Sequence, residues 1–271
     1  MPGPPTYLDR IVAAHRASAG ADRRSLASLA AAASAAPPPR PFAAALASVA
    51  ATGDLAVIAE IKRRSPSRGD LDVGLDAAAV AVAYEQGGAA CLSVLTDEEF
   101  FGGSGADLQA ARGAVALPVL RKDFTVAPAD VYDARGMGAD AVLLIVAALS
   151  DAELVELQGL TTELGMDALV EVHDEDELAR ALSVGARLIG VNQRDLVTFS
   201  VDTSRAVRLV AAMPARVMAV AESGINGPES AAVLAAAGYP AVLVGETLMR
   251  SADRTAAVTA LRSCAALRLP R

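Results

Sequence analysis

The sequence predicts an α/β protein, a (β/α)8 TIM barrel with an N-terminal helical extension, on two observations. From residue 55 onward, short apolar runs rich in β-branched residues alternate with Ala-rich helical stretches. Eight such runs are present, and several are apolar on both faces, as expected of a parallel sheet that is buried on both sides. Eight strand–helix units fit a closed barrel, whereas the alternative, a doubly wound open sheet, usually has fewer strands.

The eight apolar runs are the predicted strands. They span residues 57–61, 91–95, 119–121, 141–145, 168–172, 188–191, 217–221 and 241–244. Helices are predicted between them, for example over residues 151–164, 175–184 and 228–237. A glycine follows each of these three helices, where a C-terminal cap favours one.

The first 50 residues have a different pattern. Apolar side chains at helical spacing predict a helix over residues 7–17, and an Ala-rich stretch predicts another over 25–36, which the prolines of residues 37–41 end. A transit peptide is the alternative for this Arg- and Ala-rich region. We expect one barrel domain over residues 1–271, with residues 1–50 as its helical extension.

Composition excludes several functional classes. Of 271 residues, 24 are Lys or Arg and 32 are Asp or Glu, and aromatics make up only 3 %, which argues against a nucleic-acid partner. The longest strong apolar run, residues 141–149, is too short to span a membrane. Cys91 and Cys264 lack metal-ligand spacing and are expected to be reduced thiols. We expect a cytoplasmic monomer with no membrane partner.

Polar side chains gather at the predicted strand ends. In a barrel, the C-terminal ends of all strands meet at one mouth, where such enzymes carry out their chemistry. The strand-end residues are Glu60, Lys62, Lys122, Glu171, Asn192, Arg194, Glu222 and Ser223. Ordinary exposed residues, or a stabilising polar ring, are the alternatives. Burying an unpaired charge on an apolar segment costs free energy, so we interpret these residues as a functional site.

The charges at this mouth suit proton transfer. Three glutamates and three cationic side chains sum to −3 + 3 = 0, and a mixed site of this kind can separate pKa values by several units. Lys122 is the candidate acid and Glu171 the candidate base.

The loops after the last two predicted strands carry a candidate phosphate site. Ser223 and Gly224 follow the seventh strand, and Gly245 and Glu246 follow the eighth, where many barrels bind phosphate through backbone N–H groups. Lys62 is the expected cationic partner. Because a carboxylate would repel phosphate, we expect the Glu246 side chain to turn outward and its backbone N–H to bind the phosphate.

Three of the five phenylalanines follow the second and third strands. Phe100, Phe101 and Phe124 predict an apolar wall beside the charged groups, with loop anchoring as the alternative. No metal is expected, because His173 and the acidic residues after it do not form an HExxH motif, and His15 is the only other histidine. We interpret His173 as a structural loop residue near the mouth.

Several blocks of this chain resemble the indole-3-glycerol phosphate synthase family. Residues 58–67 (IAEIKRRSPS) are similar to its first-strand signature, and LSVLTDEEFFGG, PVLRKDF, LVEVH, IGVNQRDL, VAESGI and VLVGETLMR are similar to its later blocks, in the same order. The likeness runs from about residue 7 to 250. The family also carries an N-terminal helical extension.

The resemblance implies closure of the indole ring of a phosphorylated substrate, with loss of CO2 and water and without a cofactor. It implies that Lys122 is the general acid, that Glu171 is the base or proton shuttle, and that Lys62 contacts substrate and shares an acid role. Other matched residues hold the substrate or the lysines: Glu60, Asn192, Glu222 and Ser223. Phosphate and substrate contacts are implied for Ser65, Gly224, Gly245, Glu246 and Arg194. Phe101, Phe124 and Pro66 would face the aromatic ring.

One position departs from the family pattern, since Gln193 stands where a second asparagine is usual. Two rival functions remain at this point. A lyase of another kind would use Lys122 or Lys62 as a Schiff-base nucleophile. A non-catalytic barrel would only bind a phosphorylated metabolite, which would need neither Lys122 nor Glu171.

Overall fold

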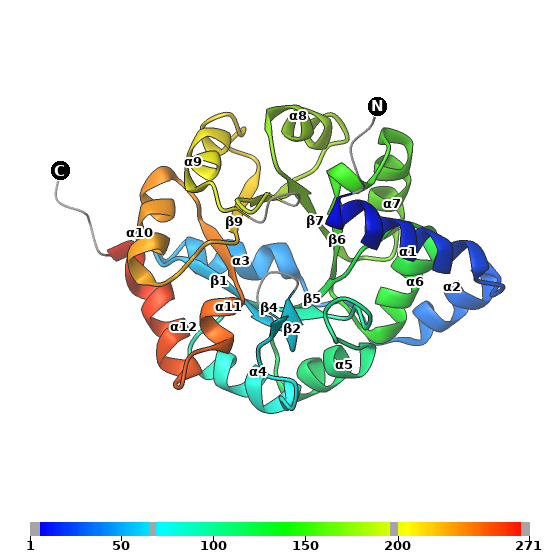
Figure 1. Ribbon diagram of the computed structural model, residues 1–271, viewed down its shortest axis with the longest axis horizontal. Helices are drawn as coiled ribbons and strands as arrows, with labels where there is room; N and C mark the ends of the chain where they lie inside the picture. Colours follow the sequence, from blue (N-terminus) through cyan, green and yellow to red (C-terminus); the bar gives the residue numbers. More distant parts are fainter. Residues whose placement is uncertain (1–5, 66–68, 196–199, 267–271) are drawn as a thin grey trace.

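The eight predicted strands form a closed barrel in which all neighbours are parallel (Figure 1). This computed structural model describes residues 6–65, 69–195 and 200–266. Around the barrel the order is β1, β4, β5, β6, β7, β8, β9 and β10, which pairs with β1 again. The barrel strands are β1 (Ala56–Ile61), β4 (Cys91–Leu95), β5 (Val119–Lys122), β6 (Ala141–Ile145), β7 (Asp167–Val172), β8 (Leu188–Asn192), β9 (Met218–Glu222) and β10 (Ala241–Val244). The predicted barrel is therefore confirmed, with strand limits within one residue of those expected.

Helices surround the barrel and cover its outer face (Figure 1). They are α4 (Ala77–Gln86), α5 (Gly105–Ala114), α6 (Pro128–Met137), α7 (Asp151–Glu163), α8 (Glu175–Ser183), α9 (Thr203–Ala211), α10 (Pro228–Ala237) and α12 (Arg254–Arg262). Short elements complete this part: η1 (Val146–Ala148), α11 (Glu246–Met249) and η2 (Ser263–Ala266). Local sequence sets their limits: Ser150 caps α7 by accepting from Glu153 N–H, and Gly238 ends α10 at a φ of 110° that favours glycine.

The apolar residues form two cores, because each strand contributes side chains to both of its faces. One core lies between the sheet and the surrounding helices and includes Leu92, Val170 and Leu234. The other fills the barrel interior and includes Ile58 and Leu143. The barrel is thus a packed body, and its chemistry is confined to the strand ends.

Three helices precede the barrel: α1 (Tyr7–Ala21), α2 (Leu26–Ala35) and α3 (Phe42–Ala50). The first two were expected, but the sequence analysis missed α3. Its Phe42 and Leu46 are fully buried among Ala56, Leu188 and Ala241, at the starts of the strands. α2 packs beside α6 (Figure 1), and α1 reaches η1 at the other end of the barrel. The extension therefore closes the base and borders the mouth.

A small antiparallel pair also escaped prediction. β2 (Arg64–Ser65) pairs with β3 (Gly69–Asp70) directly after β1. Two-residue strands carry too little periodicity to be seen in a sequence. Both cysteines are free and buried, as expected of reduced thiols. Among the described residues, no helix combines the length and apolar character needed to cross a membrane.

Candidate active site

The C-terminal ends of the strands surround a cavity of about 550 Å³. Its lining includes every predicted site residue that the structure describes: Glu60, Lys62, Ser65, Phe101, Lys122, Phe124, Glu171, Asn192, Arg194, Glu222, Ser223, Gly224, Gly245 and Glu246. The remaining predicted residue, Pro66, lies outside the described residues. Residues from seven strands or their following loops therefore meet in one place, as the barrel topology requires.

Lys122 and Glu171 face each other across this cavity. The Lys122 Nζ lies 3.4 Å from Glu171 Oε2 and 3.9 Å from Glu222 Oε2. Asn192 Nδ2 donates to the other Glu171 oxygen at 3.2 Å. Both glutamates are almost fully buried, at 2 % exposure. Lysine, base and amide thus form one connected polar cluster at the ends of β5, β7, β8 and β9.

The two buried glutamates differ in protonation because their neighbours differ. Burial alone would raise the pKa of Glu171, but the charges of Lys122 and His173 outweigh it, and the pKa is lowered. Burial raises the pKa of Glu222 well above its usual value, and the Glu171 carboxylate raises it further. The carboxyl of Glu171 therefore ionises more readily than that of Glu222.

Lys122 is held in its ammonium form. Burial would lower the pKa of Lys122, but the carboxylates of Glu171, Glu222 and Glu60 more than offset this effect and raise it. An amine of this kind is charged throughout the neutral pH range. It can donate a proton, and it is a poor nucleophile until it has lost one.

The formal charge of the six groups at the mouth, −3 + 3 = 0, does not include the effect of burial. Burial and the Glu171 carboxylate raise the pKa of Glu222 well above its usual value, so this group holds its proton more strongly than an exposed glutamate does. This shift favours an anionic substrate at the mouth.

Glu60 and Lys62 extend from the end of β1 toward the same side, as strand alternation predicts. The Lys62 Nζ lies 2.7 Å from Glu60 Oε1. Gly245 follows β10 directly beside this ion pair, and a Cβ atom there would collide with the Glu60 carboxylate and lie 2.9 Å from Lys62 Nζ. A side chain at position 245 would therefore displace the ends of Glu60 and Lys62, and glycine lets this ion pair lie against the backbone.

The loops after β9 and β10 have the backbone geometry of an anion site. Ser223 and Gly224 both adopt positive φ, at 64° and 70°, and a side chain at Gly224 would collide with Val201. α11 begins at Glu246, so its N-terminal N–H groups border the cavity. The Glu246 carboxylate approaches Arg250, with Oε1 3.7 Å from Nε.

The loops are joined by side-chain amides. Arg194 N–H donates to Asn192 Oδ1 at 3.0 Å, which fixes the Asn192 amide for its bond to Glu171. Gln193, the position that departs from the family pattern, donates through Nε2 to the Ser223 carbonyl at 2.8 Å. The unusual residue therefore ties the loop after β8 to the loop after β9.

An aromatic wall stands opposite the glutamates, as predicted, but with two members. Phe101 and Phe124 line the cavity with their ring centres 6.3 Å apart. Phe100 instead packs edge-on against Tyr7, at 6.0 Å. Neighbouring side chains in a turn point in different directions, so one of two adjacent phenylalanines had to leave the site. Ser65 is buried at the same mouth, and its Oγ has no hydrogen-bond partner among the described residues.

Several side chains of the site were not found by the sequence analysis. Tyr7, Leu8 and Ile11 of α1 line the cavity, although they precede β1 by almost fifty residues. His173 lies with Nε2 3.5 Å from Glu171 Oε1, and its Nδ1 lies 3.0 Å from Glu177. His173 was expected near the mouth only as a structural residue. Its position two residues after the candidate base is the signal that could have indicated this contact, because alternate residues of a strand share a face.

Comparison with known proteins agrees with this geometry. The sequence model of the family "Indole-3-glycerol phosphate synthase" matches residues 8–261. An indole-3-glycerol phosphate synthase of Aromatoleum aromaticum (strain DSM 19018 / LMG 30748 / EbN1) is 49 % identical over 248 residues, which cover 91 % of this chain and 95 % of that protein.

A solved structure, a thiamine phosphate pyrophosphorylase from Pyrococcus furiosus, superposes with a TM-score of 0.58 over 80 % of this chain and 97 % of its own. Its identity is only 16 %, so this likeness concerns the fold alone. The family match and the close relative, by contrast, cover nearly the whole chain and include every strand that contributes to the site. The chain therefore belongs to the indole-3-glycerol phosphate synthase family.

Proposed function

We propose that this chain, as one barrel with its helical extension, closes the indole ring in tryptophan biosynthesis. The substrate is 1-(2-carboxyphenylamino)-1-deoxyribulose 5-phosphate, and the products are indole-3-glycerol phosphate, CO2 and water. The observation that carries the proposal is the Lys122–Glu171 pair, an ammonium and an ionised carboxylate 3.4 Å apart inside the cavity. Phosphate binding alone would require neither group.

Lys122 is the general acid for ring closure. As the aryl carbon attacks the ketone, the oxygen gains negative charge, and the ammonium supplies the proton that converts it to a hydroxyl. An alkoxide is more basic than an amine, so this transfer is favourable even with a raised lysine pKa. Release of CO2 then leaves its electron pair in the ring system.

Glu171 is the base of the later dehydration. It accepts a proton from the intermediate while a lysine protonates the leaving hydroxyl, which departs as water. Asn192 and His173 hold the Glu171 carboxylate from two directions, which keeps it aimed across the cavity at Lys122. A positioned base of this kind contributes about 10²- to 10⁴-fold to a rate.

The remaining residues bind the two ends of the substrate. The phosphate is placed at Gly224, Gly245 and the start of α11, with Lys62 as the cation. The benzoate ring is placed between Phe101 and Phe124, where an apolar surface suits an aromatic ring. Arg194 and Ser65 border the space between these ends. Lys62 is next to Gly245 whereas Lys122 is next to Glu171, which supports an anion-binding role for the first and an acid role for the second.

A fluorescence assay of indole formation by the purified protein tests the proposal directly. We expect turnover with the carboxyphenylamino substrate and no added metal or cofactor. Borohydride added with substrate separates the Schiff-base alternative: we expect no covalent adduct at Lys122 or Lys62, because Lys122 is held as an ammonium. Absence of turnover, or a trapped lysine, would contradict the proposed function.

A further inference from the structure

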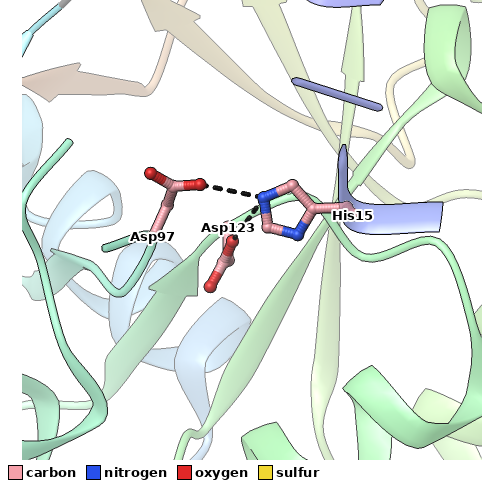
Figure 2. Close-up of side chains that lie close together, drawn as sticks. All are labelled: His15, Asp97 and Asp123. Carbon is pink, nitrogen blue, oxygen red and sulfur yellow. Dashed lines mark hydrogen bonds and ion pairs between the residues drawn. The ribbon is translucent and has the colours of Figure 1, made fainter. Parts of the chain in front are cut away.

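Helix α1 is attached to the barrel mouth through one histidine. His15 Nε2 lies 2.8 Å from Asp97 Oδ2 and 3.8 Å from Asp123 Oδ1, and Figure 2 shows the ring nitrogen directed at both carboxylates. Asp97 follows β4 and Asp123 follows β5, and both aspartates are buried. His15 thus connects the N-terminal extension to two neighbouring strand ends, one of which carries Lys122.

α1 has few other attachments to the barrel. Within α1 itself, Ile11 is the one buried side chain. Arg16 forms an ion pair with Glu153 of α7 and donates to the Ala148 carbonyl, but its side chain is 42 % exposed and the ion pair contributes little. A helix with so little apolar anchorage depends on its polar contacts for its position. Of the two contacts, the His15–Asp97 bond is the less exposed, because its carboxylate is buried and its imidazole is half-buried.

The same contact supports the aromatic wall of the cavity. Asp97 accepts from His15 with one oxygen and from the backbone N–H groups of Phe100 and Phe101 with the other, at 2.6 and 2.9 Å. The His15 ring also lies against Phe124, with ring centres 5.3 Å apart. Both phenylalanines of the wall are therefore fixed by contacts that converge on His15.

A metal ion is the other use of one histidine and two aspartates. The four carboxylate oxygens here already have donors, however. Of the two that face His15, Asp97 Oδ2 accepts from His15 itself and Asp123 Oδ1 accepts from the Phe124 N–H at 2.8 Å. Both backbone bonds to Asp97 use Oδ1, and Asp123 Oδ2 accepts from Thr96 and from Arg121 at 2.8 Å. A divalent cation would meet the Arg121 guanidinium beside its ligands. The geometry favours a hydrogen-bonded contact between protein groups.

The surroundings favour the charged imidazole. Burial would lower the pKa of His15, but the hydrogen bond to Asp97 and the carboxylates of Asp123 and Asp130 outweigh it, and the pKa is raised. Arg121 partly offsets Asp123. The net charge of the side chains that face His15 from β5, α6 and the loop after β4 is therefore negative. This charge stabilises the imidazolium form of His15.

We propose that His15 is a positioning residue for the aromatic half of the active site, which in its charged form holds α1 on Asp97 and Asp123. Through this contact it places Tyr7, Leu8 and Ile11 over the same cavity as Phe101 and Phe124. The inference rests on the proposed function for the identity of the aromatic ligand. It requires that substrate affinity weakens as His15 loses its proton, while the chemistry at Lys122 and Glu171 continues.

Steady-state kinetics of four proteins between pH 6.5 and 9 test this role: the natural chain, His15→Ala, His15→Lys and a control, Arg24→Ala. Loss of a charge-assisted hydrogen bond predicts that His15→Ala raises KM about 10- to 100-fold at pH 7, with kcat within about threefold. In the natural chain KM rises toward pH 9. In His15→Lys, whose cation does not titrate in this range, this rise is at least halved.

The control separates positioning from general loosening of the extension. Arg24 follows α1 and forms an exposed ion pair with Asp133 of α6, away from the cavity, so Arg24→Ala should leave KM unchanged. An unchanged KM in His15→Ala, an equal effect of Arg24→Ala, or the same pH dependence in His15→Lys as in the natural chain would overturn the proposal.

A second measurement does not depend on the enzymatic activity. Without substrate, at pH 8, cleavage by an arginine-specific protease after Arg10 or Arg16 reports how often α1 leaves the barrel, and this protease does not cut at the lysine of His15→Lys. We expect faster cleavage in His15→Ala than in the natural chain, and restored protection in His15→Lys. Equal cleavage of all three proteins would overturn the proposed attachment of α1. The proposed function would fail separately, as absence of indole formation by the natural chain.

Discussion

At the scale of single residues, neighbours determine what each carboxylate at the mouth does. Glu171 and Glu222 are equally buried and hydrogen-bonded to each other, yet their pKa values move in opposite directions. Glu171 has Asn192 and His173 as additional partners, whereas Oε1 of Glu222 has none among the described residues. Where two close carboxylates share one proton, the carboxylate with fewer hydrogen-bond donors and cations beside it holds that proton more strongly.

This difference predicts unequal effects of two matched substitutions. Glu171→Gln removes the more readily ionised member of the pair, and we expect kcat to fall about 10²- to 10⁴-fold, the usual contribution of a positioned base. Glu222→Gln replaces the carboxyl of raised pKa by a neutral amide of the same shape, and its loss of kcat should be at least tenfold smaller. Single-turnover kinetics measure both. Equal losses would show that Glu222 also acts in its ionised form.

At the scale of elements, α3 closes the base of the barrel, far from the chemistry. Leu46 is fully buried against the starts of the strands. Its replacement by alanine leaves a cavity, and we expect Leu46→Ala to lower the free energy of unfolding by about 2–5 kcal/mol. Because the mouth is at the opposite end, KM should stay within about twofold. Urea unfolding with parallel kinetics tests this, and a large rise in KM would contradict a purely structural role for α3.

The elements also show how far a sequence can be interpreted. The barrel was predictable because its strands are short apolar runs that alternate with helices. Each of these elements can be recognised from its own stretch of sequence, without knowledge of distant contacts. α3 was missed because an alanine run after prolines resembles a linker, and only Phe42 and Leu46 indicate its burial.

For the site, strand ends located the polar residues correctly because parallel topology brings them together. The contacts of α1 were not predictable. His15 and Asp97 are 82 residues apart, and no periodicity relates them. The raised pKa of Glu222 was equally hidden, since it depends on burial next to Glu171.

At the scale of the whole molecule, two histidines make stability depend on pH. His15 and His173 both have raised pKa values: burial opposes the shift, but hydrogen bonds to Asp97 and Glu177, respectively, outweigh it. A group whose pKa is raised on folding contributes its full stabilisation below its unfolded pKa and loses it as pH rises through the folded pKa. Stability should therefore decrease from pH 6 toward pH 9.

Thermal unfolding between pH 6 and 9 measures this decrease. We expect Tm to fall over the range in the natural chain, and to fall by less in His15→Ala, which has lost one of the two titrating groups. A Tm that rises with pH, or an identical slope in both proteins, would contradict the assignment of charged histidines to the folded state.

The central claim is that Lys122 acts on the transition state as an acid. Lys122→Ala, compared with the natural chain in turnover and in affinity for indole-3-glycerol phosphate, tests it most directly. The account predicts a loss of turnover of about 10²-fold or more, with product affinity within about tenfold, because the proton is transferred only as the new bond forms. Equal losses of turnover and affinity would show that Lys122 binds the substrate and does not catalyse its closure.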